Sequence, residues 1–211
     1  MIKIGLKGLA KFIVSSPAAQ RKVLRDYKYP KREGEAQARY YYEARLLIRR
    51  NHSRGNPQGW LSARSQELSV KAQAQSGAGA LRVRHNARAL REYNQFWGNK
   101  TFEILNGLPL SLSYSGVTIS IYPDLHVREA GVERIIKLEF ASKPPGDIAI
   151  RIMSQAMFEA ASAAGLNLRA ADILLVDVPR KAVYRGARMR SRTAKDIEAA
   201  CQTIADIWPS L

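Results

Sequence analysis

The chain has few of the residues that build redox and zinc sites. Among its 211 residues there is one cysteine, Cys201, and there are three histidines, His52, His85 and His126. A single cysteine cannot form a disulfide within the chain, so we expect a reducing, cytoplasmic location. The scattered histidines lack the ligand spacing of a structural zinc site. No apolar run approaches the ~18 residues of a spanning helix, and no membrane span is expected.

Acidic residues are also scarce. The chain has 34 Lys and Arg against 18 Asp and Glu, a formal net charge of +16. The imbalance lies in residues 1–100, which hold 21 basic and 6 acidic residues, whereas residues 101–211 hold 13 and 12. An excess of this sign and size attracts polyanions, of which nucleic acid is the commonest. The alternatives are a solvated basic surface and an acidic protein partner.

The hydrophobic periodicity changes near residue 100. Residues 34–52 place apolar side chains at helical spacing among arginines, which predicts a helix in a basic, mainly helical region over 1–100. Residues 101–211 predict a mixed-sheet core, and the two regions are expected to form one compact unit. The patterns favour strands at 108–116, 117–127, 134–142, 171–180 and 181–189, with helices at 146–165 and 191–208. A helix between buried strands predicts an α/β fold whose mixed sheet is flanked by helices.

Two carboxylates stand in the predicted strands, Asp124 and Glu139. Alternation places Asp124 and His126 on one face of their strand, and Lys137 and Glu139 on one face of the next. Carboxylates that converge across the ladder repel each other unless a cation lies between them. Oxygen ligands of this kind suit Mg²⁺ or Mn²⁺, and Lys137 would orient an attacking water. The alternative is an edge strand on which Lys137 and Glu139 face solvent.

This pattern resembles the PD-(D/E)xK nuclease superfamily, especially its RecB-like exonuclease branch. Asp124 follows Pro123, Glu139 comes 15 residues later, and the "QAMF" segment from Gln155 is similar to the branch's Gln-x-x-Tyr motif, with Phe replacing Tyr. The resemblance implies a restriction-endonuclease-like fold and a nuclease that uses one or two divalent metal ions. It also implies a place in defence, repair or mobile-element systems. It assigns Asp124 and Glu139 as metal ligands and Gln155 as a positioning residue.

The sequence departs from the family at the active-site lysine. The family's lysine stands two residues after the glutamate, where this chain has Ala141. Lys137, two residues before Glu139, is the candidate replacement. Glu43 is a candidate for a further carboxylate, because the family often supplies one from an earlier helix. If the lysine is missing rather than displaced, the site is catalytically inactive and the fold serves binding.

The basic side chains expected to hold the nucleic-acid backbone are Arg39, Arg45, Arg49, Arg50, Arg54, Arg82, Arg84 and Arg88. DNA rather than RNA is the expected polymer. Two other functions stay open: an inactive nucleic-acid-binding subunit of a larger complex on the same fold, and a basic RNA-binding protein of unrelated α/β architecture. Replacing Asp124 or Glu139 with its amide is expected to stabilise the metal-free protein, because it removes repulsion between carboxylates.

Overall fold

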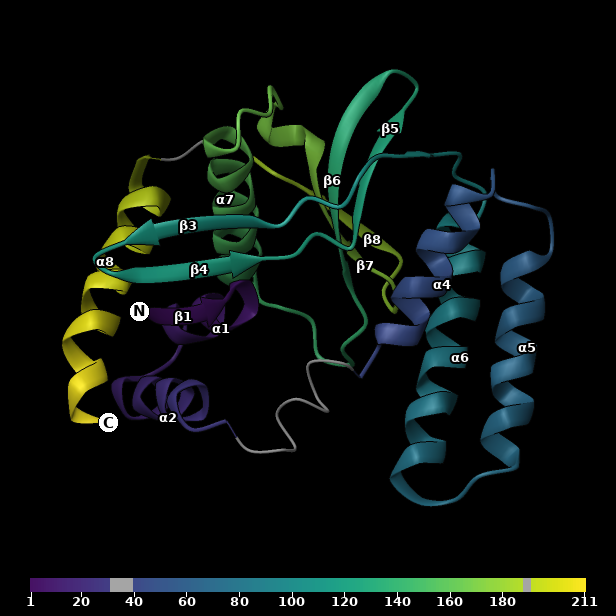
Figure 1. Cartoon of the computed structure of the whole chain (residues 1–211), viewed down its shortest axis with the longest axis horizontal. Helices are drawn as coiled ribbons and strands as arrows, with labels where there is room; N and C mark the ends of the chain where they lie inside the picture. Colours follow the sequence, from purple (N-terminus) through teal and green to yellow (C-terminus); the bar gives the residue numbers. More distant parts are fainter. Residues whose placement is uncertain (31–39, 188–190) are drawn as a thin grey trace.

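The computed structural model describes residues 1–30, 40–187 and 191–211, which fold into an α/β protein with two sheets (Figure 1). The larger sheet has the strand order β2-β5-β6-β7-β8, and the smaller has the order β1-β4-β3. The strands are β1 (Ile2–Gly5), β2 (Glu103–Ile104), β3 (Leu110–Tyr114), β4 (Val117–Ile121), β5 (Leu125–Glu129), β6 (Val132–Glu139), β7 (Ile173–Asp177) and β8 (Ala182–Arg185). The α-helices are α1 (Leu6–Ile13), α2 (Pro17–Lys28), α4 (Tyr42–Ser53), α5 (Trp60–Gln73), α6 (Gly77–Trp97), α7 (Asp147–Ala163) and α8 (Ser191–Ile207). None of the helices in these ranges is long and apolar enough to cross a bilayer.

The larger sheet is mixed, as the sequence predicted. β5 and β6 form an antiparallel hairpin, and helix α7 then crosses over so that β7 runs parallel to β6. β2 and β8 pair antiparallel at the two edges. β6 is therefore an interior strand, and the reading of residues 134–142 as a solvent-facing edge strand is wrong.

Two tight turns close the β3–β4 and β5–β6 hairpins. Ser115 and Gly116 join β3 to β4 with φ values of 50° and 76°, and Ala130 and Gly131 join β5 to β6 with 48° and 81°. Two consecutive positive φ angles are the geometry of a type I′ turn, which matches the twist of the flanking strands. The glycine in each second position adopts this conformation without steric cost.

The expected strand over residues 117–127 is two strands. β4 ends at Ile121 and belongs to the smaller sheet, whereas β5 begins at Leu125 and belongs to the larger one. Pro123 lies between them and has no N–H to donate to a ladder, so the chain leaves one sheet there. Periodicity alone did not reveal the break because both strands carry the same alternation.

Helices cover the larger sheet on both faces (Figure 1). One apolar cluster joins Ile135 and Leu175 of the sheet to α1, α7, α8 and the smaller sheet. The other joins Ile136, Leu138 and Val176 to α4, α5 and α6. The alternation along β6 thus sends successive apolar side chains into two different cores.

The beginning of the chain packs with the second half of the sequence. β1 pairs parallel to β4, and α1 packs against α7. β1 is a strand in a region that the sequence analysis took as mainly helical. The helices before residue 100 therefore do not all cover the same face of the larger sheet. Helix α1 packs on one face, and helices α4–α6 pack on the other.

Candidate functional site

Three carboxylates share one face of the larger sheet. Leu125 pairs with Ile136, so Asp124, immediately before it, stands opposite Lys137, and its N–H donates to the Ile136 carbonyl at 3.0 Å. On the other side of β6, Glu139 pairs with Asp177 of β7. Cross-strand partners lie on the same face of a sheet. The structure therefore brings Asp124, Lys137, Glu139 and Asp177 onto one face of three adjacent strands.

Asp124 is held by two cations and one backbone amide. Its Oδ1 lies 2.9 Å from Arg45 Nε of α4, and its Oδ2 lies 3.1 Å from Lys137 Nζ. Leu138 N also donates to Oδ2 at 2.7 Å, and Lys137 Nζ donates to the Tyr122 carbonyl at 2.9 Å. Burial lowers the pKa of Lys137, and the Asp124 carboxylate opposes this effect. Asp124 thus offsets part of the cost of burying this ammonium.

The Glu139 carboxylate is held by two backbone N–H groups and by a lysine of helix α1. Its Oε1 accepts hydrogen bonds from the backbone N–H groups of Phe140 at 3.0 Å and Ala141 at 3.1 Å, and its Oε2 lies 2.5 Å from Lys7 Nζ. Burial by itself raises the pKa of Glu139, but the Lys7 ammonium and the two N–H groups outweigh it and hold this pKa below its ordinary value. Sequence reasoning missed Lys7, because no local pattern connects helix α1 with β6.

Asp177 is the third carboxylate and was also missed. Its side chain is fully buried, and Arg180 Nη1 lies 3.0 Å from its Oδ2. The same guanidinium donates to the carbonyl of Ala141 at 3.4 Å and to that of Ser142. Arg180 therefore ties the end of β6 to the end of β7. A carboxylate within the apolar segment "ILLVDV" was the available signal, of the same kind that drew attention to Glu139.

The charges of this cluster do not fit a divalent metal ion as they are arranged. Asp124, Glu139 and Asp177 are faced by Lys7, Arg45, Lys137 and Arg180, which leaves the group with one net positive charge. All four carboxylate oxygens of Asp124 and Glu139 lie against N–H or ammonium groups. No group of three or more His, Cys, Asp or Glu in the described residues could hold a metal. A divalent cation would have to displace these internal cations.

Two other predicted site residues lie apart from the cluster. Gln155 Nε2 donates to Glu159 on the same helix at 2.8 Å, and its side chain lines a cavity between α7 and residues 185–187. Glu43 forms its ion pair with Lys71, at 3.8 Å. In the part of the chain that the structure describes, neither Gln155 nor Glu43 forms a hydrogen bond or ion pair with Asp124 or Glu139. The structure does not bring them into the cluster.

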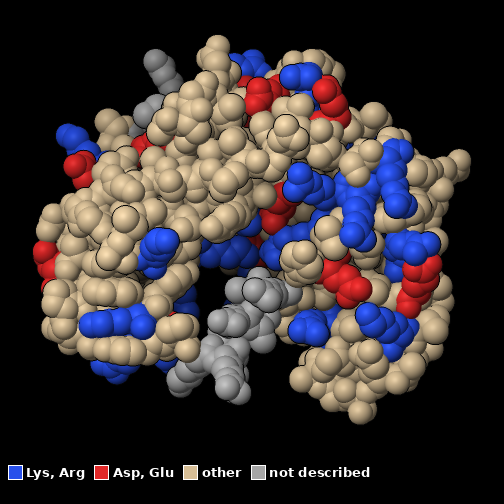
Figure 2. Space-filling model, in the orientation of Figure 1, with Lys and Arg blue, Asp and Glu red and all other residues tan. Residues whose placement is uncertain are grey.

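The predicted backbone-binding arginines divide into three groups. Arg39 lies outside the described residues, and Arg45 and Arg88 are engaged with Asp124 and Glu92. The remaining five, which we call the arginine face, are exposed and form no ion pair with any described residue: Arg49, Arg50, Arg54, Arg82 and Arg84. Figure 2 shows Lys and Arg side chains gathered over the part of the molecule formed by α4–α6 and along the adjacent hollow.

No protein-family model matches the sequence, and no curated protein is significantly similar to it.

The pairing of Lys7 with Glu139 predicts a pH-dependent effect of Lys7→Met. In the folded protein the lowered pKa of Glu139 contributes stability that is present above the ordinary pKa of 4.5 and is lost as pH falls through the lowered value. Without Lys7, the cost of burying the ionised carboxylate is offset only by the two backbone N–H groups. We expect Lys7→Met to lower the melting temperature at pH 7, and the difference from the wild type to shrink as the pH falls through the lowered pKa of Glu139, below which the carboxyl is protonated in both.

Thermal unfolding from pH 3 to pH 8 measures this effect, with Lys11→Met as the control. Lys11 is an exposed lysine one turn further along α1, so its replacement should give a small difference that does not change with pH. Burial lowers the pKa of His52 to about 4, which makes every variant less stable in acid, but this contribution cancels in the comparison. A Lys7→Met difference that is constant with pH would contradict the assignment.

Proposed function

We propose that the chain is a nucleic-acid-binding protein whose arginine face holds the phosphate backbone. The observation that carries this proposal is that five exposed guanidiniums on and beside α4 and α6 have no carboxylate partner within residues 1–30, 40–187 and 191–211. Guanidinium groups donate bidentate hydrogen bonds to phosphate oxygens, and their binding releases counterions. The formal net charge of +16 adds a long-range attraction for the same polymer.

A restriction-endonuclease-like core is part of this proposal. It is supported by the order of an antiparallel hairpin, a crossover helix and a parallel strand in β5, β6, α7 and β7. It is supported further by Asp124 before β5 and Glu139 at the end of β6, which share a face. The resemblance to PD-(D/E)xK nucleases rests on these same residues.

The charge balance of the acidic cluster favours a binding module over a working nuclease. Each carboxylate is neutralised by a lysine or arginine of the chain itself, and Ala141 occupies the position of the family's lysine. A site with a net positive charge repels Mg²⁺ or Mn²⁺ and attracts phosphate. We therefore propose a catalytically inactive module on a nuclease-like core, which acts as a subunit of a larger complex.

Titration of fluorescently labelled DNA tests the binding. A duplex and a single strand are each titrated with the protein at several salt concentrations, and the anisotropy gives the dissociation constant. Neutralisation of several phosphates should make log K fall linearly with log salt, by about 0.9 for each phosphate contact on duplex DNA. A slope near zero, or no binding at low salt, would contradict the proposal.

A metal-dependent nuclease is the second candidate, favoured by the common face of Asp124, Lys137 and Glu139. Incubation of linear duplex and single-stranded DNA with Mg²⁺, with Mn²⁺ or with EDTA separates the two functions. The binding module predicts intact DNA in every reaction. Cleavage that requires the metal and is lost in both Asp124→Asn and Glu139→Gln would instead establish the nuclease.

A further inference from the structure

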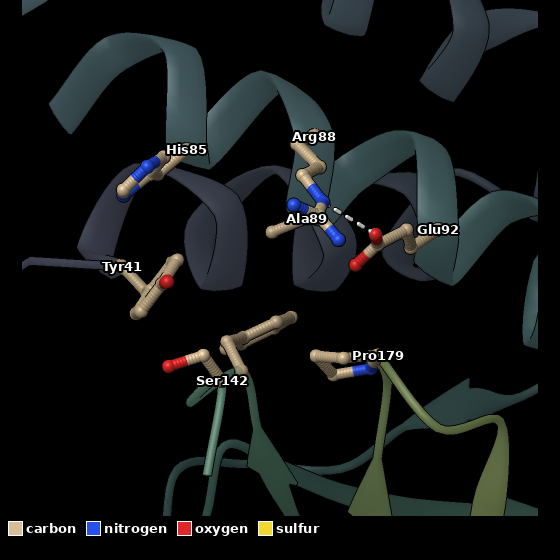
Figure 3. Close-up of a pocket in the computed structure, with 8 residues that line it drawn as sticks. Tyr41, His85, Arg88, Ala89, Glu92, Ser142 and Pro179 are labelled. Atoms are coloured by element: carbon tan, nitrogen blue, oxygen red, sulfur yellow. Dashed lines mark hydrogen bonds and ion pairs between the residues drawn. The ribbon is translucent and has the colours of Figure 1, made fainter. Parts of the chain in front are cut away.

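A small cavity lies between helix α6 and the ends of strands β6 and β7. Its volume is about 150 Å³. Figure 3 shows side chains of α6 on one side, Tyr41 from just before α4, and Ser142 and Pro179 from the segments that follow β6 and β7. Pockets that enclose drug-sized ligands measure roughly 300–1,000 Å³. This cavity therefore has room for one ring system rather than for a whole nucleotide.

The walls of the cavity suit a flat ring. The rings of Tyr41 and Phe140 are stacked, with centroids 5.1 Å apart and an interplanar angle of 29°. Ala89 and Pro179 complete the apolar lining. Bases stack on aromatic side chains in a sequence-tolerant manner, because every base has a π face. The ring of Tyr41, which is half-buried, is the accessible member of the stacked pair.

The polar lining suits the edge of a base better than a phosphate. Arg88 Nε donates to Glu92 Oε1 at 2.6 Å, so the two formal charges at the cavity cancel. The Glu92 carboxylate would repel a phosphate, but it can accept a hydrogen bond from an amino group of a base. The Tyr40 hydroxyl is bonded to His85 Nδ1 at 2.9 Å, which orients the imidazole and leaves Nε2 without a hydrogen bond among the described residues.

The cavity adjoins the acidic cluster, and its lining residue His85 directly follows Arg84 of the arginine face. Phe140 directly follows Glu139 and points to the other face of β6, into the core formed with α4–α6. The Arg45 guanidinium lies over the Phe140 ring, 5.4 Å from its centroid, while its Nε contacts Asp124. A strand bound along α4 would thus pass close to the opening of the cavity.

We propose that this cavity takes one unpaired nucleobase from the nucleic acid whose backbone lies on the arginine face. The inference rests on the proposed nucleic-acid binding and adds a preference for DNA in which a base is already unpaired. Extrusion of a base from an intact duplex costs free energy, and a bulged or single-stranded base avoids this cost. The protein should therefore bind a duplex with a single-base bulge more tightly than the fully paired duplex.

Tyr41→Ala tests the proposal by removing the stacking surface. Loss of one stacked base costs about 1–3 kcal/mol, or about 5- to 150-fold in the dissociation constant. We expect this loss on the bulged duplex and an unchanged dissociation constant on the paired duplex. Tyr41→Phe should retain the preference, because it keeps the ring. Tyr42→Ala is the matched control, since Tyr42 is the next residue, is 61 % exposed and does not line the cavity.

A second variant guards against misfolding of Tyr41→Ala. Ser142 is exposed, so Ser142→Trp fills the cavity from the surface without altering the core, and it should also abolish the preference for the bulge. Equal binding of both duplexes by the wild type, or equal effects of Tyr41→Ala and Tyr42→Ala, would overturn the proposal while leaving backbone binding intact. Binding of free nucleosides without a preference for the bulged duplex would also overturn it. No binding of either duplex would overturn the proposed function itself.

Discussion

Replacing Arg49, Arg50 and Arg54 together with alanine should weaken duplex binding by about 100-fold at low salt and lower the slope of log K against log salt by about 2.7. Each phosphate contact contributes about 0.9 to that slope, and three contacts are removed. The three side chains are exposed on or just after helix α4. Arg54 stacks on Trp60, with its guanidinium 5.3 Å from the ring centroid, which limits its motion and places it for a phosphate.

The control for this variant removes the same charge elsewhere. Lys181, Arg192 and Lys195 are exposed and follow residue 143 in the chain, so their joint replacement also lowers the net charge by three. Because only general attraction is lost, we expect a much smaller change in the dissociation constant and little change in the slope. Equal losses in the two triple variants would show that net charge rather than the arginine face governs binding.

Arg45 is left out of the triple variant, although it lies on helix α4 with Arg49 and Arg50. Its Nε lies 2.9 Å from Asp124, and its side chain is only 21 % exposed. Replacing Arg45 would remove part of the internal compensation of the acidic cluster as well as a cation. A loss of binding in such a variant would not distinguish the two causes.

Asp124→Asn should lower the free energy of unfolding by about 3–5 kcal/mol, the usual cost of leaving one partner of a buried ion pair without the other. The expectation from sequence was the opposite, that the substitution would relieve repulsion between carboxylates. The structure changes the sign because Asp124 lies against Lys137 and Arg45 rather than against an unpaired carboxylate. The Lys137 side chain is 14 % exposed, so water cannot replace the lost partner well.

Urea denaturation of the purified variants measures this effect. The double variant Asp124→Asn with Lys137→Met should recover part of the loss, because both buried charges are then removed. Glu67→Gln is the control: it breaks an exposed ion pair with Arg64 and should cost less than about 1 kcal/mol. An unchanged or raised midpoint for Asp124→Asn would show that repulsion with Glu139 outweighs the ion pair.

The features of the fold that could be predicted from the sequence are those that depend on residues close together in the chain. Alternation predicted the strands on either side of Asp124 and the strand that holds Glu139. These predictions depend on residues within a few positions of one another, whose backbone preferences act wherever the segment lies. The mixed order of antiparallel and parallel strands followed from the same periods, because a helix between two buried strands requires a crossover.

Only the tertiary structure decided which charges meet. Glu139 is paired with Lys7 from the first helix, and Asp124 with Arg45 from the other side of the sheet. The same packing decided that β4 and β5 belong to different sheets and that Tyr41 stacks on Phe140 beside a cavity. The sequence by itself determined which face of its strand each side chain occupies, because successive residues of a strand point to opposite faces. The partner of a buried charge depends on which distant segments the apolar cores bring together, and the energy of that pairing changes sign with the partner.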